Sequence, residues 1–172
     1  MKKLFFALWP DDETRQGLMR LQTSMEAKRM KWVSGQNLHV TLVFLGNVDE
    51  ATEAMIKERV ADISAEPFVL TFDQLSYWSR PRILCLTCRQ FGHEVVDLAD
   101  ALDQAAADCG LETDTRPYTP HITLARQARA IVQEFAPIIW RADSFCLMES
   151  CGTSEGVIYK VLRKWPLIKT VG

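Results

Sequence analysis

The sequence lacks any long apolar segment, and its N-terminus lacks the features of a secretion signal. A membrane-spanning helix needs about 20 consecutive apolar residues, and no stretch of the 172-residue sequence approaches that length. The opening "MKKLFFALWPDDETR" has two lysines but only a short apolar run before its acidic residues, and no small-residue cleavage site follows. These features predict a cytoplasmic protein with no membrane association.

The sequence also lacks an excess of charge of either sign. Its 20 Lys and Arg residues against 22 Asp and Glu residues leave a net charge of −2 and a pI near 5.9. This balance argues against a broad basic surface that grips long duplex nucleic acid, so a small or terminal ligand fits better. Hydrophobic residues make up 48% of the chain, which is enough for a core in one domain or two small lobes.

Cysteines are few, and their pattern indicates no disulfide framework. Five cysteines at irregular spacing are an odd number, and a reducing cytosol is the simpler setting for them. Cys85 and Cys88 form a C-x-x-C within "RILCLTCRQ", which has the pattern of a strand, whereas a redox pair needs a helix N-terminus to lower the thiol pKa. We therefore expect these two cysteines to be packing residues.

Hydrophobic periodicity and turn residues predict alternating strands and helices. Acidic residues open the first two expected helices, and a glycine ends the third. The expected helices cover residues 10–30, 49–64 and 93–110, and the expected strands cover residues 3–8, 38–46, 67–75, 82–88, 118–126, 144–150 and 157–165, with a loop at 151–156 before the last strand.

One short motif occurs twice and involves two of the three histidines. Residues 39–42 read His-Val-Thr-Leu, and residues 121–124, which begin 82 positions later, read His-Ile-Thr-Leu. That separation is close to half the length of the chain, as two copies of a strand-and-helix lobe would produce. The sequence therefore predicts an internal duplication that contributes one motif from each half.

Strand geometry places the histidine and the threonine of each motif on one face. Residues i and i+2 of a strand project to the same side, so His39 lies beside Thr41, and Val40, Leu42 and Phe44 are expected to point into a core. The alternative is that each histidine is a core residue hydrogen-bonded to a neighbour. The repeated threonine companion favours a functional pair over that alternative.

Two imidazoles and two hydroxyls on facing strands suit an in-line displacement at phosphorus. One imidazole can deprotonate the nucleophile while the other protonates the leaving oxygen, and the threonine hydroxyls can hold the non-bridging oxygens. Arg126 follows the second motif, but strict alternation puts Ala125 on the face of His121 and Thr123 instead. Arg126 therefore contacts a phosphate only if the strand bends or ends there, and a solvated arginine is an equal alternative from spacing alone.

A metal site is the competing chemistry. Zinc needs three or four protein ligands, and the sequence near the motifs has no H-E-x-x-H, no cysteine cluster and no closely spaced carboxylate. The remaining histidine, His93, begins an expected helix and is interpreted as a surface residue. We therefore expect acid-base catalysis with no metal and no cofactor.

The paired motifs occur together with other family-like segments. "KLFFAL", "NLHVTLVFLG", "RPYTPHITLAR" and the closing "VIYKVLRKW" resemble the RNA 2′,3′-cyclic phosphodiesterases, also called 2′-5′ RNA ligases, of the two-histidine phosphoesterase superfamily. The resemblance runs over essentially the whole chain. It implies an α+β fold made of two lobes with pseudo-twofold symmetry, with antiparallel sheets lining a central cleft and helices outside, so that residues 1–172 form one domain.

The resemblance also implies roles for particular residues. Trp9 departs from the acidic and small aliphatic residues that more often precede the proline of the first segment. Two aromatic residues, Phe5 and Tyr118, match the family, and for each of them stacking on a base and packing within the protein are equal alternatives. The implied set is His39 and His121 for catalysis, Thr41, Thr123 and Arg126 for phosphate binding, and Phe5 and Tyr118 for substrate binding.

The implied reaction is hydrolysis of an RNA 2′,3′-cyclic phosphate end to a 2′-phosphate. By analogy, His121 activates water and His39 protonates the 3′ oxygen, and a 5′-hydroxyl in place of water would form a 2′-5′ linkage. The expected partners are RNA ends or nucleotides with a cyclic phosphate, bound by a monomer. Two alternatives stay open: a nucleotide- or RNA-binding module of the same fold, and a related phosphoesterase for ADP-ribose cyclic phosphate or 2′-5′ oligoadenylate.

Overall fold

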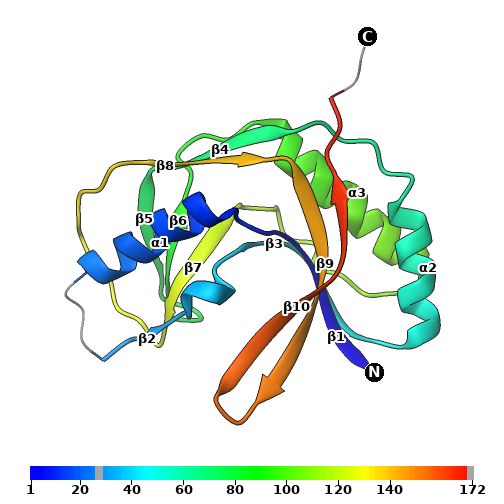
Figure 1. Cartoon of the computed structure of the whole chain (residues 1–172), viewed down its shortest axis with the longest axis horizontal. Coiled ribbons are helices and arrows are strands. Elements are labelled where there is room, and N and C mark those ends of the chain that lie inside the picture. Colours follow the sequence, from blue (N-terminus) through cyan, green and yellow to red (C-terminus); the bar gives the residue numbers. More distant parts are fainter. Residues whose placement is uncertain (26–28, 170–172) are drawn as a thin grey trace.

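The computed structural model describes residues 1–25 and 29–169 (Figure 1). The described helices are α1 (Asp12–Ser24), α2 (Glu50–Val60), α3 (His93–Asp108) and the short 3-10 helix η1 (Gly35–Asn37). The strands are β1 (Lys2–Leu8), β2 (Lys31–Trp32), β3 (Val40–Val48), β4 (Phe68–Phe72), β5 (Gln74–Trp78), β6 (Ile83–Thr87), β7 (His121–Arg126), β8 (Ile138–Ala142), β9 (Ser144–Thr153) and β10 (Gly156–Pro166).

The strands form two antiparallel half-sheets that meet at their inner edges. The strand order is β10-β9-β1-β3-β7-β6-β5, with β2 also paired to β7, and β4 and β8 form a separate two-stranded sheet. Along this order, the neighbouring strands within each half-sheet pair over four or more residues, whereas β2 pairs with β7 over two. Between the halves, β3 and β7 pair through Val40 and Ile122. This is the predicted α+β fold with two lobes, and the two histidine motifs adjoin its junction.

Each lobe takes elements from both halves of the sequence (Figure 1). Strand β1 lies between β3 and the late strand β9, which pairs in turn with β10, whereas the early strand β6 lies between β5 and the later strand β7. Two helices also contact the other half of the sequence. Helix α3, from the second half, packs against β3 of the first half, and Gln22 of α1 donates to the carbonyl of Leu124 in β7 at 3.1 Å. The two lobes are therefore interlaced, and the single domain over residues 1–172 stays a prediction.

Strand β1 is buried on both faces, which explains its continuous apolar sequence. Leu4, Phe6 and Leu8 belong to the main core, whereas Phe5 and Ala7 belong to a smaller cluster with two residues of β9, Cys146 and Met148. We call the side of the sheet that carries Phe5 and Ala7 the motif face, because the register of β1 with β3 puts Ala7 opposite Thr41. The main core thus lies on the other side of this half-sheet.

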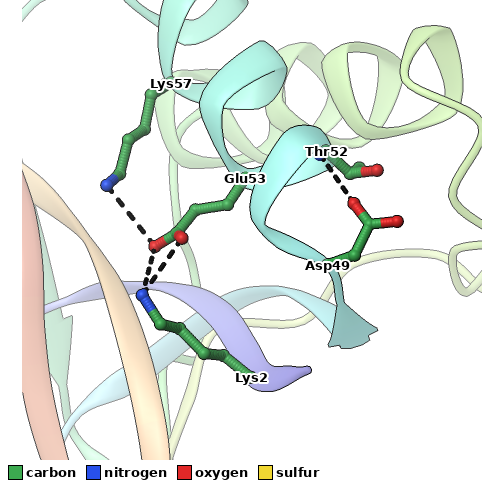
Figure 2. Close-up of polar contacts among 5 residues, drawn as sticks. All are labelled: Lys2, Asp49, Thr52, Glu53 and Lys57. Atoms are coloured by element: carbon green, nitrogen blue, oxygen red, sulfur yellow. Dashed lines mark hydrogen bonds and ion pairs between the residues drawn. The ribbon is translucent and has the colours of Figure 1, made fainter.

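A buried carboxylate ties helix α2 to the start of β1 (Figure 2). Glu53 is only 5% exposed, and both its oxygens accept hydrogen bonds from Lys2 Nζ, at 3.1 and 3.2 Å, while Lys57 Nζ lies 3.4 Å away. Burial alone would raise the pKa of Glu53, but the hydrogen bond from Lys2 and the charge of Lys57 lower it below its ordinary value. At the helix start, the Asp49 side chain accepts from the Thr52 amide at 2.7 Å, a normal N-cap.

Replacing Glu53 with Gln is expected to lower the free energy of unfolding by about 1–2 kcal/mol at neutral pH, because hydrogen bonds to charged groups contribute roughly that much when partly screened by solvent. A carboxyl whose pKa is lowered by folding stabilises the protein fully above its ordinary value of 4.5, and this contribution is lost as the pH falls through the folded value. Urea unfolding at several pH values measures both effects.

The exposed Glu58 of the same helix supplies a matched control, since Glu58→Gln should change stability little. A difference between wild type and Glu53→Gln that stayed constant down to pH 2 would contradict an electrostatic role for this carboxylate.

Several local expectations about the bounds of strands and helices were wrong. The strand expected over 67–75 is interrupted at Asp73, and its parts β4 and β5 pair in different sheets. Strands β2 and β8 were not predicted, and β9 extends through Thr153 into the segment expected to be a loop. Helix α1 ends at Ser24, and residues 26–28 of the longer expected helix lie outside the described residues.

The C-x-x-C cysteines are packing residues, as expected. Cys85 lies in β6, Cys88 follows it directly, and both side chains are buried. Burial raises the pKa of Cys85 to about 12 and that of Cys88 to about 11, so both thiols stay protonated.

Candidate active site

The two motifs lie side by side on adjoining antiparallel strands. Because Val40 pairs with Ile122, an antiparallel register sets His39 across from Thr123, and Thr41 across from His121. These four side chains alternate with the buried Val40 and Ile122, so they share the motif face. The junction between the lobes thus brings together the two motifs that the sequence separates by 82 positions.

Both imidazoles are held by the same backbone contact. Nδ1 of His39 lies 2.6 Å from the carbonyl oxygen of Asn37, and Nδ1 of His121 lies 2.9 Å from that of Thr119. Since a carbonyl only accepts, Nδ1 carries the proton of each neutral ring, and Nε2 is the nitrogen with a free lone pair. In His39, Nε2 accepts a hydrogen bond of 2.8 Å from the Thr41 hydroxyl.

Aromatic rings enclose His39. The centroids of Phe5 and Tyr159 lie 5.2 and 5.1 Å from its imidazole, and Trp9 stacks on it at 5.8 Å with an interplanar angle of 22°. This burial lowers the pKa of His39 to about 4, with smaller contributions from the charges of His121, Arg126 and Arg15. His39 is therefore neutral at neutral pH when no ligand is bound.

His121 has a more open environment than His39. The Trp78 ring lies 4.6 Å from its imidazole at an angle of 55°. Burial lowers the pKa of His121, the hydrogen bond to Thr119 opposes that shift, and the charge of Arg126 adds to it. Because cations depress both imidazole pKa values, a bound anion at this place would raise them.

Arg15 of α1 secures the segment that precedes His39. Its Nη1 donates to the carbonyl of Gly35 at 2.6 Å and to that of Leu38 at 3.1 Å, and its guanidinium lies 4.8 Å from the Trp9 ring centroid. Sequence reasoning missed this residue. A signal was present, because Arg15 precedes the buried Leu18 by three positions and so lies on the same helix face.

Arg126 reaches the motif face through a β-bulge. Cys85 pairs with Thr123 and Leu84 with Ala125, so Leu124 is an extra residue in β7. Ala125 is consequently buried in the main core, and the expectation that it shares the face of His121 was wrong. Arg126 is exposed, and its charge lowers the pKa of both histidines. The strand ends there, and Gln127 turns the chain with a φ of +47°.

The same irregularity occurs in the first motif. Ala7 pairs with Thr41 and Phe6 with Val43, so Leu42 is the extra residue in β3. Phe44 was expected in the core, but it is 67% exposed. Its ring lies 6.1 Å from the ring of Phe5, on the motif face. The bulge is the reason, because it reverses the alternation beyond Leu42.

The two aromatic residues expected at the substrate have other contacts in this structure. Phe5 is only 3% exposed, so its ring supports His39 but offers little surface to a base. The hydroxyl of Tyr118 donates to the carbonyl of Thr41 at 2.9 Å, and burial raises the pKa of Tyr118. These placements favour packing over stacking for both, and their role in substrate binding stays a prediction.

The surroundings of the motifs and the rest of the described chain add three findings. Within residues 1–25 and 29–169, no three His, Cys, Asp or Glu side chains gather as a metal-binding cluster. His93 is exposed at the start of α3, where its Nδ1 lies 2.9 Å from Asp97 Oδ2. In the same described part, no helix has the length and apolar character that a membrane crossing requires.

The interlaced α+β fold and its two His-x-Thr motifs define the class of two-histidine phosphoesterases. The sequence matches the family described as LigT like phosphoesterase over residues 8–85 and again over 86–159, in agreement with the internal duplication. The chain belongs to this LigT-like phosphoesterase family.

Named relatives and solved structures agree with that membership. The chain is 31% identical over 170 residues to the RNA 2′,3′-cyclic phosphodiesterase of Escherichia coli K12, covering 96% of this chain and 97% of the relative. It is 29% identical over 175 residues to the Archaeoglobus fulgidus protein of the same name, covering 94% and 98%. The structure is similar to E. coli LigT in apo form, with a TM-score of 0.89, 30% identity and 98% of each chain covered. It is equally similar to E. coli LigT complexed with 3′-AMP, with a TM-score of 0.89, 30% identity, and 98% and 99% covered.

Proposed function

We propose that this chain hydrolyses RNA 2′,3′-cyclic phosphate ends to 2′-phosphates by acid-base catalysis with His39 and His121. The observation that carries the proposal is the matched pair of imidazoles on one face, each with Nδ1 held by a backbone carbonyl, so that Nε2 is the nitrogen that can exchange a proton with a ligand. The activity named for the relatives in E. coli and A. fulgidus supports the choice of substrate.

The proposed step is an in-line displacement at phosphorus. The oxygen of water bonds to phosphorus while its proton passes to Nε2 of His121, and the bond from phosphorus to the 3′ oxygen breaks as that oxygen takes a proton from Nε2 of His39. Assigning the base to His121 and the acid to His39 rests on the family resemblance. Thr41, Thr123 and Arg126 stabilise the charge on the non-bridging oxygens in this mechanism.

The low pKa of His39 fits an acid that is charged only when substrate is bound. Burial and nearby cations put this pKa at about 4, and the negative phosphodiester favours the protonated imidazole on binding. With a 5′-hydroxyl in place of water, the same geometry would form a 2′-5′ linkage, so ligase activity is part of the proposal. We further propose that the enzyme acts as a cytoplasmic monomer.

The test is a product assay on nucleoside 2′,3′-cyclic phosphates. We expect the 2′-phosphate as the product, formed at an unchanged rate in a strong chelator, because the proposed groups are imidazoles and hydroxyls. Chromatography that separates 2′- from 3′-phosphates gives the result. A 3′-phosphate product would contradict the direction of cleavage, and activity lost in chelator but restored by zinc or manganese would contradict metal independence.

A further inference from the structure

The guanidinium of Arg15 is partly buried and is held by neutral groups. Its Nη1 donates to the carbonyls of Gly35 and Leu38, and its Cζ lies 4.8 Å from the Trp9 ring centroid. Its Nη2 is buried with no hydrogen-bond partner among the described residues. Burial lowers the pKa of Arg15 below its ordinary value, so its charge is unfavourable at this place. A buried donor without a partner lowers stability, and the position of Arg15 therefore has another reason than stability.

The two carbonyls that Arg15 holds flank the residue that orients His39. Residues 35–38 read Gly-Gln-Asn-Leu, and the carbonyl oxygen of Asn37 lies 2.6 Å from Nδ1 of His39. The Asn37 side chain donates in turn to the carbonyl of Val157 in β10 at 2.8 Å. Asn37 is thereby fixed from α1 through its neighbours, and from β10 through its own amide.

The Asn37 carbonyl decides which nitrogen of a neutral His39 ring carries the proton. At Nε2, the hydroxyl of Thr41 lies 2.8 Å away, and a hydroxyl can donate or accept, so it fits either tautomer. A carbonyl only accepts and therefore requires the proton on Nδ1. An acid that gives up its Nε2 proton is left in this same Nδ1–H form, so the carbonyl stabilises the ring after the transfer.

The second motif restrains its carbonyl by a different device. Residues 117–120 read Pro-Tyr-Thr-Pro, and the two prolines fix the backbone torsion φ at their positions. The hydroxyl of Tyr118 also donates to the carbonyl of Thr41 at 2.9 Å. Residues 35–38 contain a glycine and no proline, so their backbone is intrinsically more mobile. The first motif therefore needs a restraint from another element, and Arg15 supplies it.

We infer that Arg15 is a positioning residue of the reaction, which fixes the Asn37 carbonyl and through it the tautomer and direction of the His39 imidazole. Arg15 acts through the protein and does not contact the substrate. Trp9 adds to the restraint, because its ring contacts the guanidinium and also stacks on His39 at 5.8 Å. The inference rests on the proposed function and adds to it a residue outside the two motifs.

Nitrogen-15 NMR of the imidazoles provides a readout that does not depend on turnover, because it distinguishes Nδ1–H from Nε2–H rings. At about pH 8, above the ordinary imidazole pKa of 6.5, both motif rings are neutral. His39 should be in the Nδ1–H form in wild type and in a mixture of both forms in Arg15→Ala. His121 should keep its Nδ1–H form in both proteins. Arg20→Ala is the matched control, since Arg20 is exposed on the same helix and should leave both rings unchanged.

Steady-state kinetics on adenosine 2′,3′-cyclic phosphate test the effect on the reaction. In Arg15→Ala, kcat should fall roughly 10- to 100-fold with KM little changed, since a slightly misplaced group costs up to about 10²-fold. Arg15→Lys keeps a charged donor but loses the flat contact with Trp9, so it should show the same changes at smaller size. It replaces Arg15→Ala if that variant does not fold.

Three results would count against the inference or against the function on which it rests. A wild-type kcat or a wild-type His39 tautomer in the folded variant would overturn the positioning role. A raised KM with unchanged kcat would also overturn it, because that result would place Arg15 on the ligand. Absence of hydrolysis by wild type would overturn the proposed function instead, and the tautomer measurement would then decide the role of Arg15 by itself.

Discussion

Replacing either His39 or His121 with alanine is expected to lower kcat by roughly 10²- to 10⁴-fold, the range that a positioned acid or base contributes. The expectation follows from the geometry, because each Nδ1 is committed to a backbone carbonyl and each Nε2 is the group available for proton transfer. Single-turnover rates on adenosine 2′,3′-cyclic phosphate, with circular dichroism to verify folding, make the measurement.

The double variant should be little slower than the slower single variant, since the two histidines act in one step. His93→Ala is the matched control, because this third histidine is exposed at the start of α3 and should leave the rate unchanged. Near-wild-type activity in a folded His39→Ala or His121→Ala would contradict the two-histidine mechanism.

The pH profile supplies a second measurement on the same pair. The free-protein pKa values are lowered, to about 4 for His39, so the mixed protonation state that the mechanism needs is populated at lower pH in the free enzyme than in the complex. The pH dependence of kcat reports the enzyme–substrate complex, and that of kcat/KM reports the free enzyme. The profile of kcat should therefore be shifted to higher pH than the profile of kcat/KM. The two apparent values belong to the coupled pair.

Replacing Arg126 with alanine is expected to lower kcat by about 10²- to 10³-fold, the cost of losing a preorganised donor to developing charge. Arg126→Lys keeps the charge that lowers both histidine pKa values but loses the planar two-donor contact. We expect an intermediate loss of roughly 10-fold or more, since hydrogen bonds to charged groups contribute about 1.5–3 kcal/mol.

The exposed Arg141 of β8 offers a control, because Arg141→Lys should leave the rate unchanged. Steady-state kinetics of the three variants distinguish the phosphate contact from a general effect of charge. A wild-type rate in Arg126→Lys would remove the bidentate contact from the mechanism, and a wild-type rate in Arg126→Ala would remove the residue from the site.

The face shared by each histidine and threonine could be predicted from the sequence, because it depends on the two-residue period within one strand. The positions of Phe44 and Ala125 could not. Each lies beyond a bulged leucine, and a bulge arises from the register with a partner strand that comes from elsewhere in the chain. The error was therefore the same in both motifs.

The surroundings of His39 were predictable only in part. The resemblance identified Phe5, but the structure adds Trp9 and Tyr159, which lie 159 − 9 = 150 positions apart in sequence. Their contact depends on β10 pairing with β9, which in turn pairs with β1. Side-chain periodicity within a segment carries no information about such strand order.

The exchange of strands between the lobes has a consequence for the duplicated sequence. If the chain were cut after residue 85, the first fragment would leave the edge of β1 without β9, and the second would leave β7 without the larger part of β6. We therefore expect that neither fragment closes its own core when it is alone. We also expect the two recognisable copies to unfold as a single cooperative unit, in which a substitution in one copy alters the surroundings of the other copy's histidine.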